Sequence, residues 1–594
     1  MAAEDLPSEF DVVILGTGLA ESVVGAACSR VGQKVLHLDR KTYYASNWAS
    51  FTFNGLLTWI QQQQENPPPE ERQDLSGLLE EGEELIYLNN SDSPSVSNLQ
   101  VFCYASEEDE EEEEEAQKTT EETGEVKLES GDAVSGPEEE TEEKVDESDD
   151  KQDEEPSEDA PEPPKQPESP KKKKISYAQL VKEGRRFNID LVSKLMYSRG
   201  ALVDLLIKSN VSRYAEFKNV TRILTYRNGS VEQVPCSRAD VFASRQLSMV
   251  EKRKLMRFLT SCMEESEEQQ AYNGRPYAEF LRDQQLGDNL QHFLLYSIAM
   301  ATEVTPTEVG LASTRHFLRC LGRYGNTPFL FPVYGLGEIP QCFCRMCAVF
   351  GGIYCLRHSV QSLVVDKNKN RCKAVIDSRG QRISCSHFVA EDSYVTAETK
   401  KTSARFLSRA VLITDGSVLP SDSEQQVSMV TVPPEEAGHP AVHMVELCSS
   451  TMTCMPGTYL VHLTCQSVGS AHEDLSPLIT KIFRTPESPD KEAPSVLWCM
   501  YFNMADGSSV EVQGHQLPSN VYLCTGPDGS LGHEHAIGQA EFIFKNILPN
   551  EEFCPPAPNP EDIIYDGENG SSTEEAEKVA EEEESEQRTL PVEE

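Results

Sequence analysis

Long hydrophobic runs are missing from this sequence of 594 residues. No apolar stretch reaches the roughly 18 residues that a membrane-spanning helix needs, so we expect no such helix. The N-terminal stretch MAAEDLPSEF is acidic and has no apolar core, which is not the pattern of a secretory signal. The C-terminal residues PVEE contain no cysteine for lipid attachment. Together with 17 cysteines that suggest reduced thiols, these features predict a soluble, cytosolic protein.

Basic residues are scarce relative to acidic ones. The chain has 53 Lys and Arg against 99 Asp and Glu, a formal net charge of −46. Residues 105–170 contain 30 acidic and 5 basic residues, and residues 568–594 contain 11 and 2, which leaves about −12 on the rest. Because they are rich in charge and poor in aliphatic side chains, these two segments are predicted to be disordered. The acidic balance repels phosphates, so we expect no nucleic-acid partner.

The third glycine of a dinucleotide-binding fingerprint is missing from the first motif, FDVVILGTGLAESVVGAACSRVGQKVLHLDR. An apolar strand, a turn at Gly16 and Gly18, a helix and a second strand ending at Asp39 predict a βαβ unit. In that unit glycines let the backbone approach a pyrophosphate, and the acidic residue binds the ribose. Glu21, however, stands where the third glycine belongs, and its carboxylate would repel an anion at the helix N-terminus. We therefore predict a degenerate nucleotide fold that binds no cofactor.

A second glycine-rich turn lies near the C-terminal end, in NVYLCTGPDGSLGHEHAIGQAEFIFKNIL. It follows a predicted strand, Val521 to Cys524, contains Gly526 and Asp528, and precedes a helix. In flavoproteins a strand, turn and helix of this kind close over the flavin. The presence of both motifs in one chain favours a flavoprotein-like ancestor.

Motifs for catalysis and metal binding are also missing. No glycine-rich loop ends in Lys-Ser or Lys-Thr, so nucleotide hydrolysis by that route is not expected. Cys344 and Cys347 form a C-x-x-C, but a zinc site needs a second pair at a defined spacing. We expect no catalytic residues and no metal.

The expected fold class is α/β, with a flavoprotein-like domain I and an inserted all-helical domain II. From Ile175 the apolar residues take a spacing of 3.6, with Asn188 as a helix N-cap and Gly200 between two helices. The expected divisions are the first part of domain I at 1–104, the acidic insertion at 105–174, helical domain II at 175–315, the remainder of domain I at 316–567, and the acidic tail at 568–594.

Four blocks of the sequence resemble one family. They are GTGLAES, LHLDRKTYY, RRFNIDLVSKLMYSRG with SRYAEFK, and RYGNTPFLFPVYGLGEIPQCFCRMCAVFGGIY. In this order they are similar to the Rab GDP-dissociation inhibitor and Rab escort protein superfamily, and the acidic insertion with CFCRMC points to the escort branch. The resemblance implies a non-catalytic component A of Rab geranylgeranyltransferase. Such a protein binds unprenylated, GDP-bound Rab, presents it to the catalytic α/β heterodimer, and escorts the prenylated Rab to membranes through transient contact.

The resemblance also implies a Rab-binding surface. The family's tyrosine matches Tyr44, and its glutamate, glutamine and arginine match Glu338, Gln341 and Arg345; Tyr334, just before the glycine turn, is grouped with them. Glu338 and Arg345 have the chemistry for charge-assisted hydrogen bonds to a GTPase, although an internal salt bridge between them is an open alternative. The family's Tyr-Tyr-Gly-Gly reads YYAS here, which leaves the placement of Tyr44 open.

The predicted helical domain supplies two further candidate sites. An apolar stripe is the candidate wall of a pocket for the geranylgeranyl lipid, with core packing as the alternative for each member: Leu191, Leu195, Leu202, Leu205 and Leu206. For docking on the transferase we expect the amphipathic helix after Asn273, with Tyr277 and Phe280 as anchors.

Two other functions compete with the escort interpretation. One is a Rab GDP-dissociation inhibitor that extracts and recycles only prenylated Rab, which predicts no affinity for the transferase. The other is an FAD-dependent oxidoreductase, which predicts a yellow protein with flavin absorbance.

Overall fold

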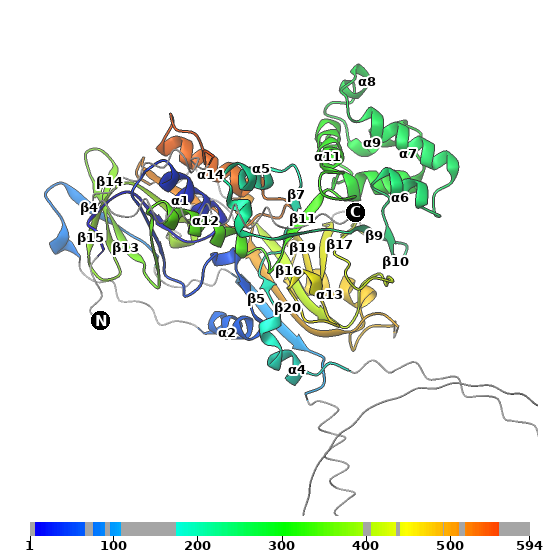
Figure 1. The fold of residues 1–594 in the computed structure, drawn as a ribbon, viewed down its shortest axis with the longest axis horizontal. Helices are drawn as coiled ribbons and strands as arrows, with labels where there is room; N and C mark the ends of the chain where they lie inside the picture. Colours follow the sequence, from blue (N-terminus) through cyan, green and yellow to red (C-terminus); the bar gives the residue numbers. More distant parts are fainter. Residues whose placement is uncertain are drawn as a thin grey trace, which may run out of the picture.

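The computed structural model describes residues 6–65, 75–89, 96–107, 174–395, 405–434, 440–490, 492–509 and 517–556. The predicted acidic tail lies outside the described residues, as does nearly all of the predicted acidic insertion. Figure 1 shows two sheets side by side along the long axis and a group of helices at the far end from the first sheet. Among the described residues, no helix is long and apolar enough to cross a membrane.

The predicted βαβ unit is confirmed. Strand β1 (Glu9–Leu15) leads through a turn at Gly16, where φ is +110°, into helix α1 (Leu19–Arg30) and strand β2 (Val35–Asp39). The two strands are parallel, with Val12 opposite Val35, and their side chains are almost all buried, as expected for a parallel sheet.

The first sheet grows from this unit on both sides. Its parallel part has the order β12-β2-β1-β15-β21, and an antiparallel meander, β14-β13-β4, continues from β15. The further strands are β4 (Glu83–Tyr87), β12 (Ile353–Leu356), β13 (Val360–Asp366), β14 (Arg371–Asp377), β15 (Arg382–Glu391) and β21 (Val521–Cys524).

Helices α1, α12 (Glu338–Val349) and α14 (Glu534–Ile547) pack together on one face of the first sheet. Strand β21 and helix α14 are the C-terminal strand and helix predicted from the second glycine-rich turn, which confirms that motif. The buried apolar side chains of this layer therefore come from the beginning, the middle and the end of the chain.

The second sheet is mixed and has the order β10-β9-β17-β18-β19-β16-β20-β5. Helix α13 (Ala471–Ile482) covers one of its faces with an apolar cluster. Its strands are β5 (Val96–Cys103), β9 (Arg222–Arg227), β10 (Ser230–Gln233), β16 (Phe406–Thr414), β17 (Ser428–Val432), β18 (Val442–Cys448), β19 (Tyr459–Gln466) and β20 (Val496–Ala505).

The prediction of an all-helical segment from residue 175 is wrong at residues 189–197 and 217–233, which contain strands. Asn188 caps no helix there: it precedes the short strand β6 (Ile189–Asp190), which pairs with β3 (Ser50–Phe51). Strands β7 (Met196–Tyr197) and β8 (Phe217–Asn219) flank β11 (Phe329–Pro332) in a small sheet. These strands find partners far away in the sequence, which a local periodicity does not reveal. The domain limits themselves remain predictions.

Helices do occupy the rest of the segment. Gly200 precedes helix α5 (Ala201–Lys208), but strand β7 comes before it, so it does not separate two helices as predicted. Helix α5 packs on α14 rather than in the helical group. The helical group itself runs from residue 238 to 320 and lies at the right end of Figure 1. Its helices are α6 (Arg238–Ala243), α7 (Met249–Ser261), α8 (Glu267–Gln270), α9 (Tyr277–Asp283), α10 (Asp288–His292), a π-helical turn (Phe293–Ile298) and α11 (Thr307–Cys320). Helices α2 (Phe53–Gln64) and α4 (Tyr177–Lys182) pack together beside the second sheet.

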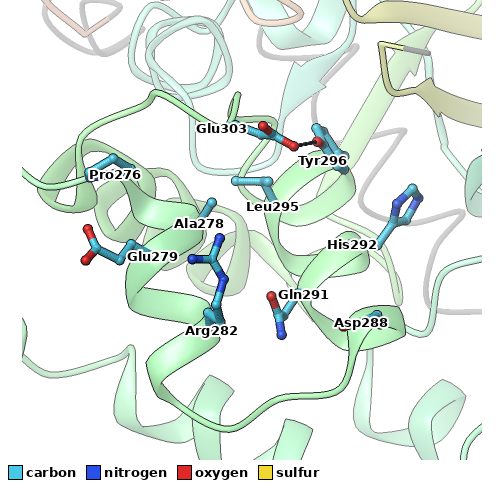
Figure 2. A pocket seen from close by; sticks show the side chains of 10 residues that line it. All are labelled: Pro276, Ala278, Glu279, Arg282, Asp288, Gln291, His292, Leu295, Tyr296 and Glu303. Atoms are coloured by element: carbon cyan, nitrogen blue, oxygen red, sulfur yellow. Dashed lines mark hydrogen bonds between the residues drawn. The ribbon is translucent and has the colours of Figure 1, made fainter. Parts of the chain in front are cut away.

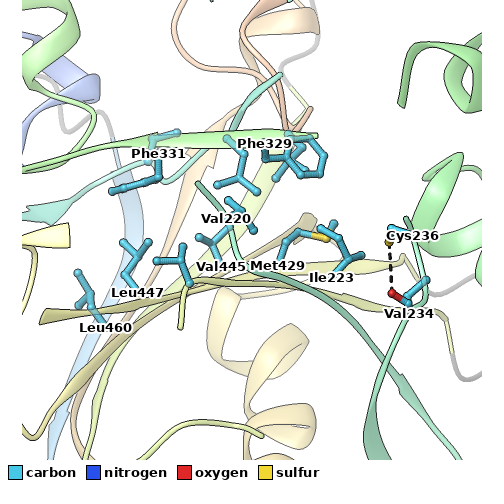
Figure 3. Close-up of a cluster of buried hydrophobic side chains, with 14 of the residues drawn as sticks. Val220, Ile223, Val234, Cys236, Phe329, Phe331, Met429, Val445, Leu447 and Leu460 are labelled. Carbon is cyan, nitrogen blue, oxygen red and sulfur yellow. Dashed lines mark hydrogen bonds between the residues drawn. The ribbon is translucent and has the colours of Figure 1, made fainter. Parts of the chain in front are cut away.

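A continuous apolar core joins the second sheet to the small sheet. Figure 3 shows Phe329 and Phe331 of β11 above the strands that carry Met429, Val445 and Leu447. The same buried cluster extends to the inner sides of the helical group. The helices are therefore fixed to the sheets by apolar packing and not by a single connecting segment.

Candidate functional site

The nucleotide cleft of the first sheet is filled by carboxyl groups. Glu21 is buried in the first turn of α1, and a Cβ atom placed on Gly18 would lie 2.5 Å from its Oε2. The side chain therefore folds back over the turn where a pyrophosphate would approach the backbone. Burial, with a contribution from the nearby Glu391 carboxylate, raises the pKa of Glu21 well above its ordinary value.

Two more acidic residues of this cleft are held by the protein itself. Asp39 accepts a hydrogen bond from Thr17 Oγ1 at 2.6 Å, and Glu391 accepts one from Ser46 Oγ at 2.9 Å. A Cβ on Gly16 would meet the Glu391 side chain at 3.0 Å. An anionic dinucleotide would face buried carboxyls at its phosphates, so these residues do not fit the cofactor of a flavoprotein.

The C-terminal turn is also engaged internally. Lys194 is buried and its Nζ lies 2.6 Å from Asp528 Oδ1. The same ammonium donates to the carbonyl oxygen of Gly532 at 3.0 Å. Burial lowers the pKa of Lys194, while the ammonium helps to hold the pKa of Asp528 below its usual range. A buried, hydrogen-bonded ion pair thus closes the turn that would cover a flavin.

The outer face of α12 lines a cavity of about 320 Å³. Glu338, Gln341 and Arg345 follow one another at i, i+3 and i+7 on this face, and Tyr44 reaches the same cavity from the loop after β2. Residues on the opposite side of α12, such as Phe343 and Cys347, are buried in the helical layer of the first sheet. The structure therefore brings four of the five predicted Rab-binding residues together.

A glycine turn positions the start of α12. Gly335 has a φ of +96°, and a Cβ there would lie 2.6 Å from Asp190 Oδ1. Leu336 N donates to that carboxylate at 2.8 Å, and Gly337 N donates to Ser50 Oγ at 2.8 Å. Burial raises the pKa of Asp190 to about 7. These contacts fix the direction in which Glu338 leaves the turn.

The charged side chains of the cavity, Arg345 and Glu338, are not paired with each other. The guanidinium carbon of Arg345 lies 4.6 Å from the ring centroid of Tyr214, so the two side chains form a cation–π contact. Glu338 is half-buried, and this burial raises the pKa of its carboxyl. Among the described residues no ion pair within 4 Å joins Glu338 to Arg345, so the internal salt bridge left open above does not form.

Tyr44 reaches the cavity despite the missing glycines. Ala45 and Ser46 take φ values of +75° and +47°, the left-handed region that glycine adopts without cost. Ala45 N donates to Thr17 Oγ1 at 2.9 Å, which holds this backbone in place together with the Ser46 bond to Glu391. The fifth predicted residue, Tyr334, is exposed but lies outside the cavity lining.

Five residues that line the cavity were not predicted as part of it: Tyr214, Cys342, Cys344, Ala348 and Tyr354. Tyr214 is the tyrosine of SRYAEFK, and its position between charged residues was a signal that it is exposed. Tyr354 and Cys344 also line the cavity, and their side chains are joined by a hydrogen bond of 2.5 Å. Burial raises the pKa of Cys344 to about 12.

The C-x-x-C cysteines serve as packing residues on α12. Cys344 Sγ lies 3.3 Å from Ser22 Oγ and Cys347 Sγ lies 3.1 Å from Ser29 Oγ, so each thiol has its own serine on α1. Within the part of the chain that the structure describes, no group of His, Cys, Asp and Glu could hold a metal ion.

The five leucines of the predicted lipid pocket do not form one stripe. Leu191 and Leu195 belong to the cluster under the second sheet, and Leu202, Leu205 and Leu206 to the cluster of α1, α12 and α14. All five are buried, as the core-packing alternative requires.

Tyr277 and Phe280 also point inward. Tyr277 is buried against Gly310 and shares a hydrogen bond of 2.9 Å with Thr314 of α11, while Phe280 stacks among aromatic side chains. The outward side of the same helix lines a cavity of about 440 Å³. Figure 2 shows Arg282 pointing into this cavity, with α10 and the hydrogen-bonded pair Tyr296 and Glu303 around it, whereas Glu279 points away from them.

Comparisons with known proteins agree on one family. A model described as GDP dissociation inhibitor matches residues 6–75, and one described as RAE1/2 domain I, C-terminal region, matches residues 407–529. The Rab proteins geranylgeranyltransferase component A 1 of Rattus norvegicus is 52% identical, with 95% of this chain and 94% of that protein covered. Component A 2 of Homo sapiens is 49% identical, with the same shares covered.

The fold has a matching solved structure. The crystal structure of a Rab GDI from Plasmodium falciparum has a TM-score of 0.59 at 17% identity, with 92% of this chain and 100% of that chain covered. This confirms the expected fold class, and the curated relatives confirm the resemblance read from the four sequence blocks. The chain belongs to the Rab geranylgeranyltransferase component A family.

Proposed function

We propose that this chain captures GDP-bound, unprenylated Rab GTPases, presents them to the α/β heterodimer of Rab geranylgeranyltransferase, and escorts the prenylated Rab to membranes. The observation that carries the proposal is the cavity on α12, in which Tyr44, Glu338, Gln341 and Arg345 meet. Family membership supports it independently, because the relatives are named as component A of that transferase.

The chemistry of the cavity suits a protein ligand. Glu338 supplies an acceptor, Gln341 both a donor and an acceptor, and Arg345 a planar donor in cation–π contact with Tyr214. Tyrosines around these groups offer rigid contact area at low entropic cost. Tyrosine and arginine, two of the residue types that line this cavity, are enriched in protein–protein interfaces.

The prenylation chemistry belongs to the partner in this proposal. The cavity thiols are poor nucleophiles, because burial raises the pKa of Cys342 to about 11 and that of Cys344 to about 12. Both remain protonated at neutral pH. The chain's contribution is to bind and orient the Rab.

We propose that the transferase docks on the outward side of α9. Tyr277 and Phe280 are core residues and do not serve as anchors, whereas Arg282 is exposed in the cavity of Figure 2. Reversing this charge, Arg282→Glu, is expected to weaken transferase binding about tenfold by repulsion at the contact. Titration calorimetry with the heterodimer measures the change, and Rab binding stays as in the wild type. Arg319→Glu, an equal charge reversal on α11, is the control and leaves transferase affinity unchanged.

Covering the lipid is part of the escort role. A geranylgeranyl chain has about 20 carbons, and at roughly 0.8 kcal/mol per buried methylene its exposure would be strongly unfavourable. The five leucines predicted as its wall are packed in two separate cores, so the proposal places no lipid contact on them.

A recycling inhibitor is the second candidate, favoured by the match of the GDP dissociation inhibitor model to residues 6–75. The two functions differ in the Rab that they accept. A pull-down with unprenylated, GDP-bound Rab and the transferase separates them: the escort function predicts a ternary complex. Capture of prenylated Rab alone, without transferase, would assign the recycling function instead.

A further inference from the structure

The helical group carries a basic face that neither the Rab cavity nor the outward side of α9 uses. Residues 238–257, which span α6 and most of α7, contain six basic and two acidic residues in a chain of net charge −46. The two acids, Asp240 and Glu251, belong to capping boxes and accept hydrogen bonds from the backbone N–H of Ser237 and Ser248. They are therefore held at the helix starts, and the cations set the sign of the surface.

The outer side of α7 is formed by cations and apolar side chains. At 100° per residue, Met249, Val250, Arg253, Lys254 and Arg257 fall on one side of the helix, and all five are exposed. Lys254 donates to a backbone carbonyl of the neighbouring loop at 2.6 Å. Arg253 and Arg257 form no ion pair with any other residue that the structure describes.

Apolar side chains rise from the same surface. Phe242 at the end of α6 is 66% exposed, and Met249 and Val250 at the start of α7 are 61% and 62% exposed. The opposite side of α7 is ordinary core, with Leu255, Phe258 and Leu259 buried. An exposed Phe, Met and Val beside free arginines is the pattern of a helix that lies in a membrane interface.

We propose that this α6–α7 basic face docks on the surface of a bilayer that contains anionic lipids. The charge is complementary to phosphate and carboxylate headgroups, and the three apolar side chains match the boundary of the acyl region. An acidic protein segment is the alternative ligand, but it would pair with the arginines and leave the three apolar side chains exposed. The net negative charge of the chain does not prevent docking, since charges beyond about 8 Å are largely screened at physiological salt.

The position of the face fits the delivery of a bound protein. In Figure 1 α7 lies at the right end of the long axis, well away from α12, which carries the Rab cavity. Docking through α6 and α7 therefore leaves that cavity free. The inference rests on the proposed function, because it names the surface by which an escort meets its membrane.

The test uses the full-length chain and vesicles, with no Rab present. Co-sedimentation is measured with phosphatidylcholine vesicles and with vesicles containing about 30% phosphatidylserine, at low and high salt. We expect binding to the anionic vesicles only, weakened by salt. Arg253→Glu with Arg257→Glu is expected to lower this binding about tenfold or more, and Phe242→Ser with Val250→Ser by several-fold. Arg253→Lys with Arg257→Lys retains it.

The matched control places the same charge change elsewhere. Lys367 and Lys369 are exposed in the loop between β13 and β14, at the other end of the molecule. Lys367→Glu with Lys369→Glu should bind vesicles like the wild type. The inference is overturned by equal binding to neutral vesicles, by no binding to anionic ones, by full binding of the arginine variant, or by an equal loss in the control.

Two further measurements distinguish a loss of membrane binding from unfolding of a variant and from a failure of the proposed function. All the substituted side chains are exposed, so thermal unfolding of each variant should match the wild type. Rab capture in solution should also be unchanged in the Arg253→Glu, Arg257→Glu variant. Failure of vesicle binding with Rab capture intact would reject the membrane face alone, whereas failure of Rab capture in the wild type would reject the proposed function.

Discussion

Among single residues, Arg345 is the side chain on which Rab capture is expected to depend most. It stands exposed at the mouth of the α12 cavity with its guanidinium held by Tyr214. Arg345→Glu is expected to weaken the binding of unprenylated Rab by about 1–3 kcal/mol, because a charge-assisted contact becomes a repulsive one. Titration calorimetry measures the affinity. Lys367→Glu carries the same charge change and should bind normally; unchanged affinity of the Arg345 variant would remove this residue from the interface.

Glu21 predicts a pH dependence of stability. Its pKa is higher in the folded than in the unfolded chain, where the ordinary value is 4.5, so folding favours the protonated carboxyl. The stability that this group contributes is fully present below pH 4.5 and is lost as the pH rises above that value. Glu21→Gln removes the titration. The variant should therefore gain about 1 kcal/mol or more over the wild type at pH 8, and less at pH 5.

Chemical denaturation of both proteins at several pH values measures that difference. If the difference in the free energy of unfolding between Glu21→Gln and the wild type stays constant from pH 5 to 8, the pKa of Glu21 is not raised by folding and the prediction is wrong.

The residues of the candidate site were predictable only in part. The spacing of Glu338, Gln341 and Arg345 on a helix follows from the sequence, but their role came from family resemblance. Tyr214 was missed because it reaches the cavity from a segment far from α12 in the chain. Tyr354 was missed although it lies on β12, the strand that follows α12, because the local pattern does not show that its side chain turns back to the helix. Tyr277 and Phe280 were misplaced, since an amphipathic helix shows which residues share a side but not which side meets the core.

At the level of helices and strands, the contact between α9 and α11 depends on a glycine. A Cβ on Gly310 would lie 2.3 Å from Tyr277 Cγ, well inside contact distance. Gly310→Ala is therefore expected to destabilise the protein by about 1–3 kcal/mol through overpacking. Gly538 on α14 has no atom within 4 Å of its Cβ position, so Gly538→Ala should instead stabilise by up to about 1 kcal/mol.

Thermal unfolding of the two glycine variants checks this pair of opposite effects. Equal stability of both variants would mean that the two helices separate easily and that α9 is not rigidly placed. In that case the outward side of α9 would be a poor platform for the transferase.

Helices and strands that have a clear local sequence pattern were predicted correctly. Short strands that form only by pairing with residues far away in the sequence were not. The βαβ unit, β21 and α14 follow from apolar runs and glycine turns. Residues 189–197 show leucines at helical spacing, yet they form β6 and β7 because their partners are β3 and β11. A single sequence contains no signal for such non-local pairs.

In the whole molecule, the surfaces proposed for Rab and for the transferase lie far apart. The α12 cavity, proposed for Rab, lies on the helical layer of the first sheet, and the outward side of α9, proposed for the transferase, lies in the helical group at the other end of Figure 1. A Rab and a transferase bound at these places need not compete for one surface. The filled nucleotide cleft explains why a flavoprotein-like fold serves here as a scaffold.

The transfer of geranylgeranyl groups to an unprenylated, GDP-bound Rab tests the central claim most directly. Purified transferase heterodimer, Rab and labelled geranylgeranyl donor are combined with and without this chain, and label on the Rab is counted. The account predicts transfer only when the chain is present, with a reduced rate for Arg345→Glu at limiting Rab. Equal transfer without the chain, or no transfer with it, would contradict the account.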